Sequence, residues 1–264
     1  MDNKMISKFH TLVRRNILME KPLVVFGDSS AEIFDYIFGK NKNYYPFWAS
    51  GWSARSLNQI KHSDVDIKPY ASILETLPKD SIILLHFGMT DIEFGLPILA
   101  RDTGFYNLPL FLKEMIDGII AFRAFLQKNY GFENIYPVFT SPPIWLPSSH
   151  WENVFKFKPF PLKIRGQMLL DFASEVSKLT TSINCLDKLI VSYKNPICSP
   201  DYTRARVSHH IDFIEAQDLV YSALSELEGM LSQRNPKHTV HYIHKNVGVD
   251  TVRKEQQPRA NTCI

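Results

Sequence analysis

Short apolar runs that stop at glycine recur along the chain and predict buried strands. The run "LVVF" at residues 23–26 ends at Gly27, and "SIILLHF" at residues 81–87 ends at Gly88. Continuous apolar runs of this length are typical of strands that are buried on both faces of a parallel sheet. An aromatic run and a further apolar run extend the pattern, so we predict strands over residues 23–26, 44–49, 81–87 and 135–139.

Between these runs, apolar residues recur at the three- and four-residue spacing of an amphipathic helix. The clearest example is residues 110–130, where Phe111, Met115, Ile119 and Phe122 fall on one helical face. The remaining patterns predict helices over residues 29–38, 164–179 and 211–231 and in parts of 53–60 and 67–77, and a weak strand over residues 184–191.

The alternation of strand and helix indicates the fold class. Repeated β-then-α units with right-handed crossovers form a central, mostly parallel sheet with helices on both faces. We therefore predict an α/β protein, a three-layer αβα sandwich. Ligands of such sheets bind beyond the carboxyl ends of the strands, so residues that follow a predicted strand are the first candidates for chemistry.

The segment over residues 142–161 is rich in Pro, Trp, Phe and Ser and shows no periodicity. A loop of that length inside a compact domain is often a lid or a binding loop. Its aromatic side chains either pack the loop against the domain, which we favour, or stack on a ligand. They are Trp145, Trp151, Phe155, Phe157 and Phe160.

Composition supports one folded domain and argues against a nucleic-acid partner. Hydrophobic residues make up 45% of the 264 residues and charged residues 22%, which allows a sizeable core. The 30 basic and 27 acidic side chains are interspersed and give a net charge of only +3, so we expect no concentrated phosphate-binding field. We expect an N-terminal extension over residues 1–21, a domain over residues 22–233 and a polar C-terminal extension or tail over residues 234–264.

The cysteines and the N-terminus are typical of an intracellular protein. Cys185, Cys198 and Cys263 are too widely spaced for a disulfide framework or a CxxC metal site. The N-terminus has no uninterrupted apolar signal region, and no stretch approaches 18 apolar residues. We therefore expect a cytoplasmic protein without a membrane span. The sequence does not indicate its oligomeric state.

A histidine-rich stretch near the C-terminus suggests a metal site at first sight. His238, His241 and His244 are three residues apart, a spacing that does not align side chains on a strand. No cysteine or carboxylate completes a convincing ligand set. We interpret the stretch as incidental and expect neither a metal nor an organic cofactor.

The predicted strands end in small polar segments that are candidates for chemistry. These segments are Gly27-Asp28-Ser29, Gly51 and Gly88-Met89-Thr90-Asp91. Ser29 begins a predicted helix, where it is either an N-cap for the first backbone amides or a nucleophile exposed at the sheet edge. Thr90 and Asp91 either cap a helix or contribute to a site, and we expect Asp28 to shape the turn before Ser29.

Segments in this order resemble the sequence blocks of the SGNH/GDSL hydrolase superfamily. They are "FGDSS" at 26–30, "ASGWSARSL" at 49–57, "LLHFGMTDIEF" at 84–94, "TSPP" at 140–143 and "VSHHID" at 207–212. The resemblance spans roughly residues 22–230, and the "SARSL" and Gly-x-x-Asp segments look most like bacterial members associated with envelope polysaccharide. It implies the flavodoxin-like SGNH hydrolase fold and an ester-cleaving or acyl-transferring site.

The resemblance assigns roles to residues of three segments. Ser29 would be the nucleophile, and its backbone N–H would point at the developing oxyanion. Gly51 would supply a second backbone N–H. The third oxyanion donor of the family is an asparagine, and Thr90 occupies that position here. Asp28 and Asp91 would shape the site.

The general base is implied by the last segment. The family pattern is Asp-x-x-His, in which the aspartate orients the imidazole. Counting back from His210 gives Val207, and counting back from His209 gives Arg206, so neither histidine has the family aspartate. We favour His210 as the base, with His209 as the alternative. The site is then a Ser-His dyad, or the imidazole is held by another carboxylate or by a backbone carbonyl. Asp201 is the nearest carboxylate candidate in the sequence, and Asp212 is a less favoured one.

Two functions remain open on the sequence. The first is a serine esterase or acyltransferase that acts on a small acyl ester, such as an O-acetyl group on a carbohydrate. The second is a catalytically impaired protein of the same fold that binds a glycan or a protein partner. The replaced asparagine and aspartate favour the second, and the ordered segments favour the first.

Overall fold

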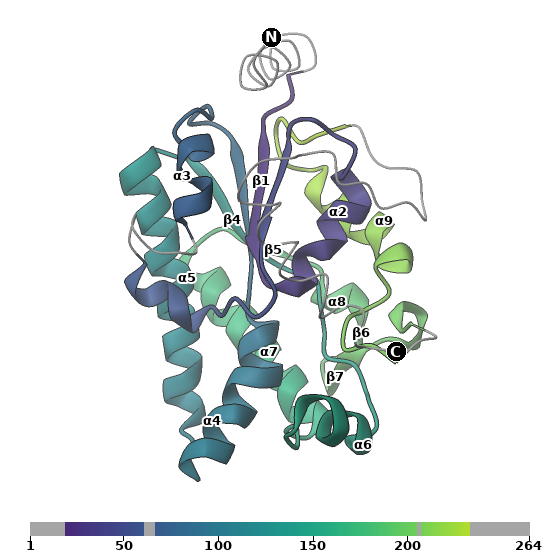
Figure 1. Ribbon diagram of the computed structural model, residues 1–264. Helices are drawn as coiled ribbons and strands as arrows, with labels where there is room; N and C mark the ends of the chain where they lie inside the picture. The colour runs from purple at the N-terminus through teal and green to yellow at the C-terminus, as the bar shows by residue number, and fades with distance from the viewer. Residues whose placement is uncertain (1–18, 61–66, 205–206, 233–264) are drawn as a thin grey trace.

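A computed structural model describes residues 19–60, 67–204 and 207–232 of the chain (Figure 1). The strands of its main sheet pair in the order β2-β1-β3-β4-β5, and each pairing is parallel. This is the flavodoxin-like strand order, whose switch point lies between β1 and β3. The predicted fold class, a three-layer αβα sandwich around a mostly parallel sheet, is confirmed. The strands are β1 (Leu23–Gly27), β2 (Tyr44–Trp48), β3 (Ile82–His86), β4 (Asn134–Phe139) and β5 (Ile183–Asn184).

Helices cover both faces of the sheet, as Figure 1 shows. One face packs against α3 (Lys68–Leu74), α5 (Leu108–Tyr130) and α7 (Leu162–Leu179). The other face packs against α2 (Ile33–Phe38), α8 (Leu186–Leu189) and α9 (Phe213–Leu224). Alternate residues of β1 supply the two cores, Val24 and Phe26 on the first face and Leu23 and Val25 on the second. The fully apolar sequence of β1 follows from this burial on both faces.

The boundaries of α5 follow from capping. Asn107 accepts a hydrogen bond from the Leu110 backbone N–H at 3.0 Å, and Gly131 ends the helix in the left-handed conformation with φ +74. Gly118 on this helix allows close packing, because a Cβ atom there would lie 1.9 Å from the Ala54 carbonyl oxygen. The segment that contains Ala54 is the one after β2, so α5 supports the loop with the candidate oxyanion donor.

Several elements differ from the sequence predictions. The predicted final helix over residues 211–231 is wrong at both ends, because Asp212 caps the helix that begins at Phe213, and the helix ends at Leu224. The weak strand predicted over residues 184–191 contains β5, α8 and β6 (Ile190–Ser192), and β6 pairs antiparallel with β7 (Asn195–Cys198). The helix α4 (Leu96–Thr103) was not predicted.

The loop over residues 142–161 contains helical turns that its composition does not reveal. They are α6 (Ser148–His150) and the π-helical turn η4 (Trp151–Phe155). Trp151 and Phe157 are buried and pack with Phe94 and Phe155, as the packing interpretation requires. Trp145 differs, because 68% of its surface is exposed. The loop and α4 lie at the carboxyl end of the sheet (Figure 1).

Some sequence predictions lie outside the described residues. These are the structures of the two extensions beyond residues 19–232, Cys263, and the histidines His238, His241 and His244. Cys185 and Cys198 are buried free thiols, and burial raises the pKa of each to about 12. Among the described residues, no helix is long and apolar enough to cross a membrane.

Candidate active site

The turn after β1 places Ser29 at the carboxyl edge of the sheet. The Asp28 backbone N–H donates to the His86 carbonyl at the end of β3, at 3.1 Å. Gly27 is required for this approach, because a Cβ atom there would lie 2.4 Å from the same oxygen. Ser29 then begins the 3₁₀ turn η1 (Ser29–Glu32) that leads into α2. The chain therefore turns sharply at the switch point of the sheet, where such folds bind ligands.

Asp28, rather than Ser29, is the cap of this turn. Its carboxylate accepts hydrogen bonds from the Ser30 N–H at 2.9 Å and from the Thr90 N–H at 3.1 Å. Complete burial raises the pKa of Asp28 to about 6, although these hydrogen bonds oppose the increase. The carboxylate joins the Ser29 turn to the segment after β3 and leaves the Ser29 hydroxyl free of a capping role.

Ser29 and His210 come together although they are 181 residues apart. The Ser29 Oγ lies 2.9 Å from His210 Nε2. His210 precedes α9, and its backbone N–H donates to Ser208 Oγ at 3.1 Å. Burial lowers the pKa of His210 well below its usual value, and the nearby positive groups act in the same direction. A neutral imidazole at pH 7, with its proton on Nδ1, can accept the serine proton at Nε2.

Two backbone N–H groups, those of Ser29 and Gly51, have the properties of oxyanion donors. Among the described residues, no acceptor is bonded to the N–H of Ser29 or to that of Gly51. Gly51 lies in the turn closed by the Trp52 N–H and the Ala49 carbonyl at 3.2 Å, with φ +80. A Cβ atom at Gly51 would meet nothing within 4 Å, so the positive φ, and not crowding, requires glycine here.

Thr90 does not cap a helix through its side chain, and its hydroxyl is the group that could act as an oxyanion donor. It precedes the π-helical turn η3 (Asp91–Gly95) without a side-chain capping bond. Its N–H is already bonded to Asp28, so only its partly exposed hydroxyl remains as a donor.

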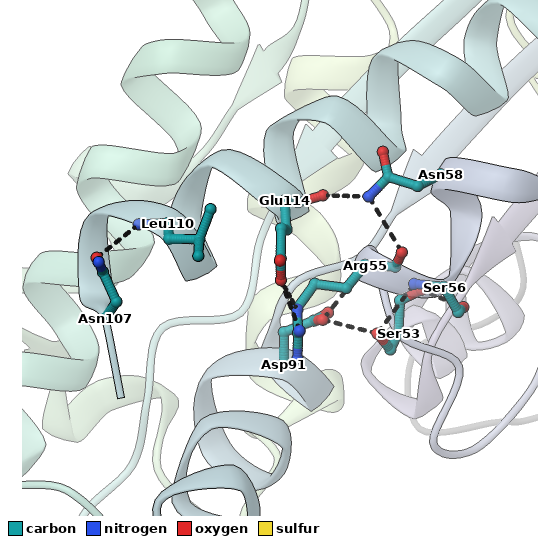
Figure 2. A network of polar contacts seen from close by, with 8 residues as sticks. All are labelled: Ser53, Arg55, Ser56, Asn58, Asp91, Asn107, Leu110 and Glu114. Carbon is teal, nitrogen blue, oxygen red and sulfur yellow. Dashed lines mark hydrogen bonds and ion pairs between the residues drawn. The ribbon is translucent and has the colours of Figure 1, made fainter. Parts of the chain in front are cut away.

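Asp91 anchors the loop that contains Gly51 (Figure 2). Its buried carboxylate accepts hydrogen bonds from Ser53 Oγ at 2.7 Å, from the Ala54 N–H at 2.7 Å and from the Arg55 N–H at 3.3 Å. Burial raises the pKa of Asp91, and the three hydrogen bonds oppose the increase. Arg55 in turn pairs with Glu114 of α5, Nε to Oε2 at 2.7 Å. Asp91 therefore connects the segments after β2 and β3 at the edge where Ser29 lies.

The structure does not bring every predicted site residue to Ser29. Asp201 is exposed in the short turn η5 (Pro200–Tyr202), and within the described parts of the chain no carboxylate is bonded to His210. Asp212 instead caps α9. His209, the alternative base, packs its ring against Phe94 and Phe155.

A buried ion pair lies beside this region and was missed from the sequence. Arg165 Nη1 donates to Glu93 Oε1 at 2.8 Å, and the side chains are 3% and 1% exposed. Burial raises the pKa of Glu93, and nearby Asp28 adds to the effect while Arg165 opposes it. Arg165 also lies over the Trp151 ring at 5.1 Å and donates from Nε to the Phe160 carbonyl at 3.1 Å. The pair fastens the aromatic loop to the turn after β3. The signal in the sequence was the position of Arg165 on the apolar face of α7.

A second buried histidine also lies near the site. His86 ends β3, and its Nε2 is 2.7 Å from Thr140 Oγ1 at the end of β4. Burial lowers the pKa of His86 to about 4, so it is neutral at pH 7. It is close enough to His210 to influence the pKa of that residue.

Comparisons with known proteins establish the fold. No protein-family model and no curated protein matches the chain. A solved structure from Streptococcus pneumoniae, provisionally described as a platelet activating factor, matches with a TM-score of 0.51 at 14% identity, over 84% of this chain and 91% of that chain. A GDSL-like lipase from Bacteroides thetaiotaomicron matches with a TM-score of 0.48 at 18% identity, over 84% and 97%.

A carbohydrate acetylesterase from Sinorhizobium meliloti matches with a TM-score of 0.44 at 12% identity, over 78% of this chain and 98% of that chain. The chain thus shares the fold of the streptococcal structure, and its parallel strand order with helices on both faces makes that fold a three-layer αβα sandwich.

Proposed function

We propose that this chain is a serine esterase of the SGNH type that acts on small acyl esters. The observation that carries the proposal is the 2.9 Å contact between Ser29 Oγ and His210 Nε2 at the switch point of the sheet. The free N–H groups of Ser29 and Gly51 support it, because a serine nucleophile requires donors for the tetrahedral oxyanion.

The proposed reaction proceeds through an acyl-enzyme. Ser29 Oγ attacks the ester carbonyl carbon while His210 Nε2 takes the hydroxyl proton. The N–H groups of Ser29 and Gly51, with the Thr90 hydroxyl, stabilise the oxyanion. His210 then gives its proton to the leaving alcohol as the C–O bond breaks. Water adds to the acyl-enzyme with His210 again as base, which releases the acid and regenerates Ser29. No metal or organic cofactor takes part.

We further propose an O-acetyl group on a carbohydrate as the substrate. The support is the exposed Trp145 on the loop that follows β4, because an exposed indole ring offers a large apolar face on which a sugar ring can stack. If an acceptor alcohol, and not water, reaches the acyl-enzyme, the same site transfers the acyl group.

Hydrolysis of p-nitrophenyl acetate and of an acetylated oligosaccharide tests the proposal. Ser29→Ala is expected to abolish the activity of the folded protein. Ser30→Ala is the matched control, because it retains the Ser30 backbone N–H that bonds Asp28 and loses only the Ser30 hydroxyl contact with the same carboxylate. The control is expected to keep most of the activity. Equal activity of wild type and Ser29→Ala would overturn the proposed nucleophile.

The second candidate is a binding protein without catalysis. The observation that favours it is His210, which has no bonded carboxylate among the described residues. Saturable binding of an acetylated glycan by a folded protein that hydrolyses neither substrate would support this candidate over the esterase.

A further inference from the structure

The imidazole of His210 must be held by something other than a triad carboxylate. Within residues 19–60, 67–204 and 207–232, His210 forms hydrogen bonds through Nε2 with Ser29 and through its backbone N–H with Ser208. A ring without an orienting partner can rotate away from the serine, and misplacement of a base is costly to catalysis. The neighbours of the ring are therefore the relevant contacts.

Two aromatic rings lie against His210. The His209 ring centroid is 3.9 Å from that of His210, with an interplanar angle of 41°. Phe213, in the first turn of α9, lies 5.7 Å away at 44°. The contact with His209 is much the shorter, so it restricts the His210 ring most strongly.

His209 is itself fixed by rings from two other segments. Phe94, after β3, lies 5.4 Å from it at 79°, and Phe155, from the aromatic loop, lies 5.6 Å from it at 90°. These are edge-to-face contacts of favourable geometry. Phe94 and Phe155 also contact each other at 5.0 Å. The ion pair between Glu93 and Arg165 of α7 supports this arrangement, because Arg165 also contacts the aromatic loop at the Trp151 ring and the Phe160 carbonyl.

We propose that His209 is a positioning residue, whose ring, packed against the edge-to-face pair of Phe94 and Phe155, holds the His210 imidazole toward Ser29 in place of the missing carboxylate. The inference deepens the proposed esterase function and rests on it. It assigns His209 neither the role of base nor a direct contact with the substrate.

The charged and titratable groups around the two histidines are consistent with this arrangement. The pKa of His210 is lowered by the nearby groups Arg204, His209 and His86. The pKa of His209 is lowered by Arg204 and His150. All of these groups disfavour a positive charge on the two imidazoles. Burial is the largest cause and lowers the pKa of His209 to about 4. Both rings are therefore neutral at pH 7, and neutral rings can stack without repulsion.

The test compares the steady-state kinetics of variants at position 209. His209→Ala is expected to lower kcat by about 10- to 100-fold with little change in KM. The loss is expected to be no larger than the contribution of the general base itself, which is about 10²- to 10⁴-fold. His209→Leu fills the space without an aromatic face and is expected to lose kcat similarly. His209→Phe keeps the aromatic packing and is expected to restore most of it. Phe105→Ala is the control for loss of a ring elsewhere, because Phe105 is exposed and has no ring contact with His209 or His210 among those of the described residues. It is expected to leave kcat near the wild-type value.

The pH dependence provides a readout that a purely structural role would not change. In wild type the acid limb of kcat/KM is expected to lie below the usual histidine value of 6.5, because burial depresses the pKa of His210. His209→Ala admits water to the ring, so the limb is expected to move up toward 6.5. In His209→Phe the limb is expected to stay near its wild-type position.

The inference fails if His209→Ala keeps the wild-type kcat and acid limb. It also fails if His209→Phe is as inactive as His209→Ala, because the imidazole of His209 would then act chemically. NMR titration of the His210 ring proton separates this failure from failure of the esterase proposal. The titration requires no substrate. A higher titration midpoint of His210 in folded His209→Ala supports the positioning role of His209, even if Ser29→Ala leaves the measured hydrolysis unchanged.

Discussion

The buried pair of Glu93 and Arg165 should respond asymmetrically to loss of either partner. A buried carboxyl without its partner can bind a proton and become neutral, whereas a guanidinium stays charged at any accessible pH. We therefore consider Glu93→Gln, which leaves Arg165 buried and charged, and Arg165→Met, which leaves Glu93. Both side chains are almost fully buried, so solvent screens neither charge.

The expected costs follow from the burial of the pair. Glu93→Gln should lower the free energy of unfolding by about 3–5 kcal/mol, the cost of breaking a buried ion pair, with little dependence on pH. In Arg165→Met, Glu93 must remain protonated in the folded protein, against an ordinary pKa of 4.5. At about 1.4 kcal/mol for each pH unit, protonation costs about 3 kcal/mol at pH 7 and less than 1 kcal/mol at pH 5.

The sign of the pH effect is set by proton binding. Burial raises the folded-state pKa of Glu93 above its unfolded value even beside Arg165, and Arg165→Met removes the guanidinium that opposes the increase, so the folded variant binds more protons between the two values. Stability is therefore fully present below about pH 4.5 and falls as the pH rises toward 8. Arg165→Met also loses the contacts with Trp151 and the Phe160 carbonyl, a cost that does not vary with pH.

Urea unfolding at pH 5, 6, 7 and 8 measures both variants. The double variant Glu93→Leu with Arg165→Met is the control, because removing both partners should cost less than Glu93→Gln alone. Equal, pH-independent losses in the two single variants would refute the reasoning, as would a double variant less stable than either.

Further predictions concern the catalytic edge of the sheet. Asp91→Asn places an amide N–H₂ against the donor groups of Ser53, Ala54 and Arg55. Because the loop that contains Gly51 then shifts, we expect kcat for p-nitrophenyl acetate to fall by about tenfold or more. Asp117→Asn, on the surface of α5, is the control. Gly51→Ala strains a backbone at φ +80 by about 1 kcal/mol and displaces the N–H of this residue. We expect kcat to fall by up to about 10²-fold with only a small change in thermal midpoint, and an unchanged kcat would exclude Gly51 from the oxyanion hole. Because the pKa of His210 is lowered by burial, kcat/KM should still be near its plateau at pH 6, and an acid limb above pH 6.5 would contradict the buried, neutral base.

The parallel sheet could be predicted because its strands are short, wholly apolar and closed by glycine. Residues buried on both faces, as in β1, leave a pattern that does not depend on distant contacts. The segments after β1, β2 and β3 could likewise be assigned, because a sharp turn such as Gly27-Asp28-Ser29 is encoded locally. The ends of α9 and the helical turns of the aromatic loop depend on tertiary packing, and the sequence pattern did not predict them.

The polar contacts across the site were less accessible from the sequence. Asp91 was expected to shape the site, but its bonds to the loop after β2 span 36 to 38 residues and have no local signature. The pairing of Glu93 with Arg165 joins residues 72 positions apart. The contact between Ser29 and His210 was expected only through the resemblance of the segments, while the ring contact between His209 and His210 is a feature of the folded chain.

Covalent labelling of Ser29 by a fluorophosphonate, followed by mass spectrometry of peptides, tests the central claim most directly. We expect an adduct on the peptide that contains Ser29 in wild type and no adduct in Ser29→Ala. In His210→Ala the adduct should form at least about 10²-fold more slowly, because the base no longer takes the serine proton. A folded wild-type protein that is not labelled at Ser29, or a His210→Ala variant that is labelled as fast as wild type, would contradict it.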